Sequence, residues 1–458
     1  MAQPDSRNPR SGRRPGRLAD DPCDTYVYDP EAECADPGTL RALAEDAWAA
    51  QAAGLADRAP FYRDRFGAGL AGLTLDDLPS LPLLTKQELK ESQLADLPFG
   101  RHLGVPADQV KKVYQTSGTT GSPSVLALTA GDVHDVWRRI GSRAYFATGI
   151  HAHSRVLNTF GAGPFVAGAT HGVLEHLGAC SIPVAPGDTG RVLNSLTIGL
   201  ADTLLGTATF ATHLATIIED RGLDGPAFGI RHVITGGEPG GGIPAVRDRI
   251  AAAFGARVTE LMGLGDVSPS LFGECPEGGG MHFAGQGLVW PELVDADGNP
   301  VELRPGAVGE PVYTSLVRSA MPVVRFRSGD IVEIQPDGCP CGRTSFRIRC
   351  IGRADDMFIV RGVNVYPSAV QEVAASFTPW VSGRSRVVVT GDAVTVDPPV
   401  LVEVERGAPG AGGAAPEDLA ARIEAEIRAR LTFRARIVLV DDDSFGEAGY
   451  KTRALVRR

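Results

Sequence analysis

The sequence predicts an α/β protein with a large N-terminal domain of layered sheets and helices and a small α+β C-terminal domain. Segments of helical and strand periodicity alternate from about residue 125 to 275, and strand signals dominate from 288 to 350. Around Gly352 the pattern changes and a new set of strands and a helix begins. Because 458 residues are too many for one ordinary core, we expect a tail over 1–20, a large domain over 21–351 and a small domain over 352–458.

Periodicity and turn signals predict the individual elements. A helix is expected over 38–57, and strands at 112–114 and 125–128 should form a hairpin. Beyond this hairpin we expect helices over 132–147, 211–221 and 245–254, and strands over 154–159 and 231–235. In the small domain we expect strands over 386–390, 401–405 and 437–439, a helix over 417–431 and a surface loop over 407–415.

Composition restricts the function classes. Hydrophobic residues make up 43% and charged residues 22% of the chain, as in soluble globular proteins. The net charge of −10 argues against nucleic-acid binding, and the five arginines within residues 7–17 are expected to belong to a disordered tail. No window of about 18 apolar residues predicts a membrane span, so we expect no membrane partner and a cytoplasmic location.

The expected hairpin carries a loop of hydroxyl and glycine residues at its tip: Thr116, Ser117, Gly118, Thr119, Thr120 and Gly121. Such a loop can direct backbone N–H groups and hydroxyls at one anion, because glycine lets the backbone approach closely. It is not a Walker A loop, since Ser122 stands where that pattern requires lysine. A polar hairpin loop without a ligand is the alternative.

A second glycine-rich turn, over 236–242, follows the strand expected at 231–235. The carboxyl end of a strand is where α/β folds place ligand loops. No G-x-G-x-x-G pattern fits this turn, so a dinucleotide fingerprint is not supported.

Three of the seven cysteines, together with a histidine, suggest a metal site. Cys275, His282, Cys339 and Cys341 offer the sulfur and imidazole donors that a tetrahedral structural Zn²⁺ needs. Cys350 is a rival fourth ligand, and ordinary buried thiols are the alternative to any metal.

Read together, these motifs resemble the acyl-adenylate-forming (AMP-binding) superfamily, and most closely its phenylacetate–CoA ligase branch, from about residue 40 onward. The resemblance implies that Thr116–Gly121 holds the phosphates of ATP, although a lysine usually stands at the position of Ser122. It also implies that Gly237, Glu238 and Pro239 pack against adenine.

Two further motifs extend the resemblance over the large domain. The segment from Met262 to Asp266 matches an aromatic-Gly-x-x-acid motif imperfectly, because methionine replaces tyrosine and aspartate replaces glutamate. Asp266 is then the implied Mg²⁺ ligand. In the segment from Arg325 to Asp330, the Asp330 carboxylate is implied to accept hydrogen bonds from both ribose hydroxyls, since its two oxygens can face a diol.

The most specific match lies at the domain junction, over 352–357 and 361–367. By resemblance, Asp355 is the hinge about which a mobile C-terminal domain turns, and Arg353 reaches the nucleotide. Lys451, near the C-terminus, matches the catalytic lysine of the family.

The implied reaction joins a small carboxylic acid to coenzyme A. The acid reacts with ATP to give an acyl-adenylate, and the thiol of coenzyme A then displaces AMP. Phe160, Gly161, Phe165 and Thr207 are the expected acid pocket, for an aryl or a short hydroxy or branched acid. Two alternatives stay open: transfer to an amine or a carrier-protein thiol, and a non-catalytic nucleotide-binding homologue. A homodimer is compatible with the resemblance.

Overall fold

The computed structural model describes residues 27–458 apart from 68, 117–123, 162, 164, 186, 362, 392–394, 408–414, 442–443 and 446–453. Most of the expected phosphate loop, Ser117–Gly121, lies outside the described residues, as do Lys451 and the tail over 1–20. Within the described part of the chain, none of the helices combines the length and the apolar character that crossing a bilayer requires.

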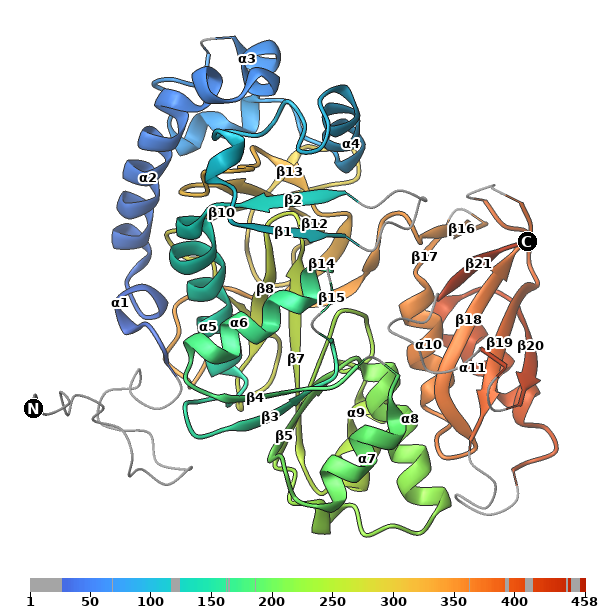
Figure 1. Cartoon of the computed structure of the whole chain (residues 1–458). Helices are drawn as coiled ribbons and strands as arrows, with labels where there is room; N and C mark the ends of the chain where they lie inside the picture. Colours follow the sequence, from blue (N-terminus) through green and yellow to red (C-terminus); the bar gives the residue numbers. More distant parts are fainter. Residues whose placement is uncertain are drawn as a thin grey trace, which may run out of the picture.

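Helices at the N-terminal end form a cap on the large domain, drawn in blue in Figure 1. They are α1 (Pro30–Glu33), α2 (Pro37–Arg58), α3 (Pro60–Phe66) and α4 (Lys86–Ala95). The prediction of a helix over 38–57 is confirmed by α2, which begins where the Asp36 side chain accepts hydrogen bonds from the N–H groups of Gly38 and Thr39. Trp48 and Leu55 of this helix are fully buried in a separate apolar cluster.

The predicted hairpin is confirmed. Strand β1 (Lys112–Gln115) pairs antiparallel with β2 (Val125–Leu128), with Gln115 opposite Val125. The hydroxyl- and glycine-rich segment therefore connects the two strands at one end of the hairpin.

One mixed sheet of 13 strands dominates the large domain (Figure 1). Its order is β11-β10-β12-β14-β15-β9-β8-β7-β6-β5-β3-β4, with β13 paired to β12. The strands are β3 (Arg155–Asn158), β4 (Cys180–Pro183), β5 (Thr203–Gly206), β6 (His232–Gly236), β7 (Arg257–Leu264), β8 (Ser268–Glu274), β9 (Met281–Phe283), β10 (Val289–Val294), β11 (Pro300–Val301), β12 (Val308–Ser315), β13 (Phe326–Arg327), β14 (Asp330–Ile334) and β15 (Arg347–Arg353). Pairing is parallel from β4 through β3, β5 and β6 to β7, and antiparallel elsewhere.

Helices cover both faces of the parallel strands. They are the π-helical turn η4 (Asp132–Trp137), α5 (Arg138–Ala147), α6 (Ala169–His176), α7 (Thr189–Thr197), α8 (Ala208–Asp220) and α9 (Pro244–Phe254). Leu204 packs in the cluster formed with α7, α8 and α9, whereas its neighbour Leu205 packs in the cluster that contains α5 and α6 residues. Successive residues of a strand point to opposite faces, so both faces of β5 are buried.

The C-terminal domain is small and has a core of its own, drawn in orange and red in Figure 1. Its four-stranded sheet has the order β20-β19-β18-β21. The elements are β16 (Phe358–Val360), β17 (Val363–Val365), α10 (Pro367–Ala375), β18 (Val381–Val389), β19 (Val400–Arg406), α11 (Leu419–Leu431), β20 (Ala435–Val440) and β21 (Leu455–Arg457). The expected strands at 386–390, 401–405 and 437–439 and the helix over 417–431 are confirmed, whereas α10 and β21 were not foreseen.

Candidate active site

Loops gather at the carboxyl ends of the parallel strands β3, β5, β6 and β7. The Thr159 N–H donates to the Leu205 carbonyl at 2.9 Å, which joins the ends of β3 and β5. The Thr209 N–H donates to the Glu238 carboxylate at 2.7 Å, which ties the second glycine-rich turn to the start of α8. The ends of neighbouring parallel strands meet at one edge of a sheet, so the predicted ligand turn lies where such folds bind ligands.

The glycines of the second turn are required by a close approach to Thr235 of β6 and Glu260 of β7. A β-carbon at Gly242 would lie 2.6 Å from Glu260 Oε2, and one at Gly241 would lie 1.9 Å from Thr235 Oγ1. Gly237 has a φ of 82°, in the region that favours glycine. The turn can therefore cover the strand ends only because it lacks side chains.

Glu260 is an acid that the sequence reading did not single out. Burial raises its pKa to about 7, the charge of Glu274 adds to this, and Arg247 and the Gly242 N–H oppose it. Arg247 is committed to Glu274 by two hydrogen bonds of 3.0 and 2.7 Å, and therefore does not neutralise Glu260 in full. A carboxylate that directly precedes the apolar pair Leu261 and Met262 in β7 was the signal in the sequence.

Asp266 lies beside both ends of the hairpin loop. A β-carbon at Gly265 would be 3.6 Å from Thr116 Cγ2, and Ser124 and Asp266 line the same small hollow. The Asp266 side chain is buried, and its Oδ2 forms an ion pair of 2.9 Å with Lys86 Nζ. The structure thus brings the predicted magnesium ligand to the predicted phosphate loop, together with a lysine that the sequence reading missed.

Asp330, Arg353 and Asp355 form one connected cluster at the domain junction. Arg353 Nη1 donates to Asp330 Oδ1 at 2.9 Å, while Nε and Nη2 donate to the two Asp355 oxygens at 2.8 and 3.1 Å. Burial lowers the pKa of Arg353, but the charge of Asp330 and the hydrogen bond to Asp355 outweigh it and raise this pKa. Three residues that the resemblance singled out separately are therefore neighbours.

The four expected acid-pocket residues surround the ends of β3 and β5. Phe160 is half-buried against the main core, Gly161 has a φ of 72°, and Phe165 is 46% exposed and forms a bridge with Gln115 at the end of β1. Thr207 is buried, and its hydroxyl accepts a hydrogen bond from the Phe210 N–H at the start of α8. Thr207 is thus a helix cap, whatever else it contacts.

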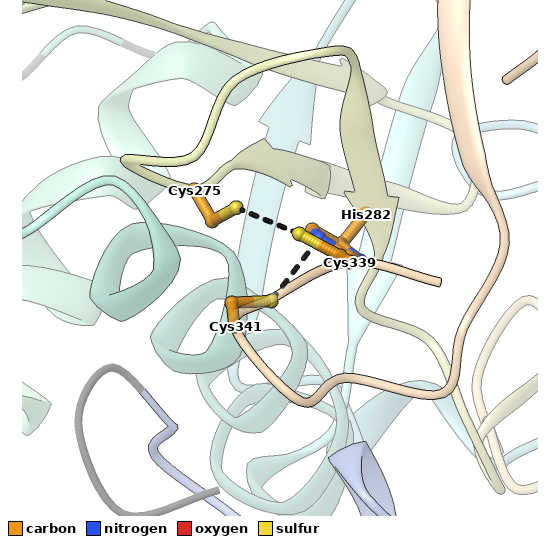
Figure 2. A group of neighbouring side chains, drawn as sticks. All are labelled: Cys275, His282, Cys339 and Cys341. Carbon is orange, nitrogen blue, oxygen red and sulfur yellow. Dashed lines mark hydrogen bonds between the residues drawn. The ribbon is translucent and has the colours of Figure 1, made fainter. Parts of the chain in front are cut away.

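The predicted metal ligands converge on one point in the large domain (Figure 2). The donor atoms of Cys275, His282, Cys339 and Cys341 all lie within 4.8 Å of one another. Cys275 Sγ is 3.5 Å from Cys339 Sγ, and Cys341 Sγ is 3.4 Å from His282 Nε2. In a tetrahedral zinc site the sulfur–sulfur and sulfur–nitrogen edges are about 3.8 and 3.6 Å, so the set has nearly the size of a zinc site.

Cys350 was weighed as a rival fourth ligand, but it lies elsewhere. It is not among the described residues of the cluster, and burial together with the charges of Asp330 and Glu260 raises the pKa of its thiol. Beside the cluster, Arg343 forms a buried ion pair of 2.7 Å with Glu33 of α1. Burial lowers the pKa of Arg343, but the charges of Glu33 and Cys341 outweigh this effect and raise it.

The large mixed sheet and the small C-terminal domain agree with the architecture that the resemblance to acyl-adenylate-forming enzymes implied. The chain is 33% identical to phenylacetate–coenzyme A ligase of Thermus thermophilus over 386 residues, which cover 82% of this chain and 84% of that protein. No family model matches the chain.

Solved structures of 2-hydroxyisobutyryl-CoA ligase are similar over nearly the whole chain. The postadenylation state in complex with R3-HIB-AMP has a TM-score of 0.85 at 27% identity, covering 95% of this chain and 93% of that one. The thioesterification state with 2-HIB-AMP and CoA has a TM-score of 0.67 at 28% identity, with the same coverage. The chain therefore belongs to the phenylacetate–CoA ligase family of AMP-forming acid–CoA ligases.

Proposed function

We propose that this protein activates a small carboxylic acid with ATP through an acyl-adenylate and transfers the acyl group to the thiol of coenzyme A. The observation that carries this proposal is the similarity of 95% of the chain to a CoA ligase structure that holds an acyl-adenylate. The Arg353 cluster adds to it, because a guanidinium beside two carboxylates is suited to hold a ribose and a phosphate.

In the first step, a carboxylate oxygen of the acid bonds to the α-phosphorus of ATP and the bond to pyrophosphate breaks. This chemistry needs in-line positioning and neutralised charge rather than a protein nucleophile. We assign the phosphates to Thr116–Gly121, the ribose hydroxyls to Asp330, the α-phosphate to Arg353 and Lys451, and adenine to Gly237–Pro239.

In the second step, the thiol of coenzyme A bonds to the acyl carbon and AMP leaves. We assign the change between steps to a rotation of the small C-terminal domain against the large domain about Asp355. The two TM-scores of 0.85 and 0.67 against different states of one homologous enzyme support this, since the present arrangement is nearer to the postadenylation state.

Two metal ions complete the proposal. Asp266 is the candidate ligand of the Mg²⁺ that accompanies ATP. A structural Zn²⁺ fits Cys275, His282, Cys339 and Cys341, because their spacing is near that of a tetrahedral site and Arg343 is close enough to offset the charge of three thiolates.

The substrate class that we propose is an aryl or a short hydroxy or branched acid. Phe160 and Phe165 supply aromatic surface near the strand ends, and the glycines around them leave room for a compact acid. The two similar enzymes act on acids of these two kinds, phenylacetate and 2-hydroxyisobutyrate, as their names state.

Pyrophosphate exchange across a panel of aryl, hydroxy, branched and long-chain acids tests the first step. We expect exchange with members of the first three groups only. Repeating the reaction with coenzyme A, a carrier protein and amines then identifies the acceptor. If none of the acids supported pyrophosphate exchange, the proposed adenylation activity would be contradicted. If the acyl group were transferred only to an amine or a carrier protein, coenzyme A would be contradicted as the acceptor.

A further inference from the structure

Residues 27–35, here called the α1 segment, lie beside the cysteine cluster. Arg343 Nε donates to Glu33 Oε1 at 2.7 Å, and both side chains of this ion pair are 2% exposed. A further hydrogen bond joins the Arg343 side chain to that of Cys341. A buried ion pair by itself adds little stability, because the cost of removing two charges from water offsets their attraction. Arg343 is better explained as a link between a candidate metal ligand and the α1 segment.

The loop that carries Cys339 and Cys341 also binds the backbone of the α1 segment. The Thr344 N–H donates to the Glu33 carbonyl at 3.0 Å, and the Thr344 hydroxyl donates to the Ala35 carbonyl at 2.7 Å. This loop runs from the end of β14 to the start of β15 and contains no helix or strand of its own. Its position therefore depends on side-chain contacts, among them those at the two cysteines.

The other connection of the cluster reaches the α1 segment through Arg143 of α5. Arg143 Nη2 donates to Asp29 Oδ2 at 2.7 Å, and Nη1 donates to the carbonyls of Ala284 and Gln286 at 3.1 and 2.8 Å. Arg143 is fully buried, and the two carbonyls follow His282 by two and four residues. The α1 segment is thus tied to the chain on both sides of the cluster.

Within the α1 segment, Glu33 connects the ion pair to the backbone. Its Oε2 accepts hydrogen bonds from the N–H groups of Tyr28 and Asp29 at 2.9 and 2.7 Å. One carboxylate oxygen therefore binds Arg343 while the other fixes the start of the segment. Displacement of Arg343 would leave a buried carboxylate without its cation, which is strongly unfavourable.

We propose that the cysteine cluster is a metal-dependent anchor for the α1 segment. Its four ligands, when they share a Zn²⁺ ion, fix the loop between β14 and β15, and this loop places Arg343 and Thr344 on the segment. Metal binding and docking of the segment then stabilise each other, because coupling between two sites is reciprocal. The inference rests on the proposed Zn²⁺ site.

Hydrogen exchange measured by mass spectrometry on the full chain reports the docking. Zn²⁺ is removed with a chelator under reducing conditions and is then added back. We expect the amides of Tyr28 and Asp29 to exchange about tenfold faster or more without Zn²⁺ and to regain protection when it returns, since local opening exposes them. The amides of α11 are the internal control, because the small domain has a core of its own, and their exchange should not change.

Arg343→Met tests the coupling in the other direction. We expect its affinity for Zn²⁺, measured by competition with a chelating dye, to fall about tenfold or more, since groups that hold a metal ligand from outside have effects of this size. Exchange in the α1 segment should become independent of Zn²⁺ in this variant. Arg349→Met is the matched control, because Arg349 lies on β15 at the surface and pairs with Glu333, and it should change neither quantity.

Several results would overturn the proposal. Equal exchange in the α1 segment with and without Zn²⁺, in wild-type protein that binds the ion, would separate the segment from the metal site. Equal acceleration in α11 would show a loosening of the whole chain instead of an anchor. Wild-type affinity for Zn²⁺ in Arg343→Met would remove the link. Wild-type protein that takes up no Zn²⁺ would contradict the metal site together with the anchor, so the two failures are distinguishable.

Discussion

At the scale of single residues, Arg353 holds two carboxylates of the site in fixed positions. Its three N–H donors bind Asp330 and Asp355, so the Asp330 oxygens are oriented before any nucleotide arrives. Preorganised acceptors bind a diol with a smaller entropic cost than mobile ones. This orientation supports the proposed role of Asp330 in ribose recognition.

Asp330→Asn tests this assignment. We expect AMP affinity to fall about tenfold or more, because hydrogen bonds to a charged acceptor become hydrogen bonds to an amide. Discrimination against 2′-deoxy-AMP should shrink in the same variant, as measured by calorimetry. Glu333→Gln, on the same strand and paired with Arg349 at the surface, is the control. Undiminished discrimination would contradict a ribose contact by Asp330.

Glu260 predicts a pH dependence of stability. Its pKa is raised from 4.5 to about 7 in the folded state, so folding favours its protonated form. The stability that this preference gives is complete below pH 4.5 and is lost as pH rises through about 7. We expect Glu260→Gln to stabilise the protein relative to wild type by roughly 1–3 kcal/mol more at pH 8 than at pH 5.

Thermal unfolding at the two pH values measures this difference. Glu302→Gln is the matched control. The Glu302 side chain is 82% exposed, and the substitution removes an ion pair of 4.0 Å with Arg304. A pH profile of Glu260→Gln that runs parallel to that of wild type would show that Glu260 ionises normally.

At the scale of elements, two connections far apart in the chain form the cysteine cluster. Cys275 follows β8, His282 lies on β9, and the remaining two cysteines lie between β14 and β15 (Figure 2). Because β9 pairs with both β8 and β15, the sheet itself brings these connections together. A bound metal would cross-link them in a region with little regular structure.

We expect about one zinc per chain in protein purified without a His-tag, measured by elemental analysis, and little in Cys341→Ala. This variant should also melt several degrees lower, since bound metal contributes folding free energy. Cys350→Ala should keep its zinc, because Cys350 lies outside the cluster. Wild-type protein without zinc, or equal metal loss in both variants, would contradict the site.

At the scale of the whole molecule, the small domain rests on α8 and α9 of the large one. Arg249 of α9 donates to the Ser382 carbonyl of β18 at 2.8 Å, and a β-carbon at Gly383 would be 3.3 Å from Val246. The proposed rotation about Asp355 would break this contact. The interface is therefore specific to one state of the proposed cycle.

Lys451→Ala tests the two-state cycle. We expect adenylation to fall by a factor of about 100 or more, because a charge that stabilises the transition state is removed. Thioester formation from a supplied acyl-adenylate should persist, since the proposed rotation withdraws Lys451 before that step. Single-turnover assays of each half-reaction decide this, and equal loss in both would contradict the rotation.

Elements whose formation depends mainly on residues close together in the sequence were predicted well. The β1–β2 hairpin and α2 are encoded by local alternation, helical spacing and caps, and both lie within a few residues of the expected bounds. By contrast, β21 is only three residues long and pairs in parallel with β18, and such a pairing leaves no local signal. Lys86 was missed for the same reason, because its partner Asp266 is 180 residues away.

The sequence by itself determined the class of enzyme, the candidate residues of the cysteine cluster and the order of the motifs, because these depend on side-chain chemistry and short-range spacing. Only the tertiary structure decided that Cys350 lies apart from the other thiols, that the pKa of Glu260 is raised and that Lys86 meets Asp266. Each of these depends on which segments the sheet brings together. Strand order and burial are properties of the whole chain, and no local pattern records them.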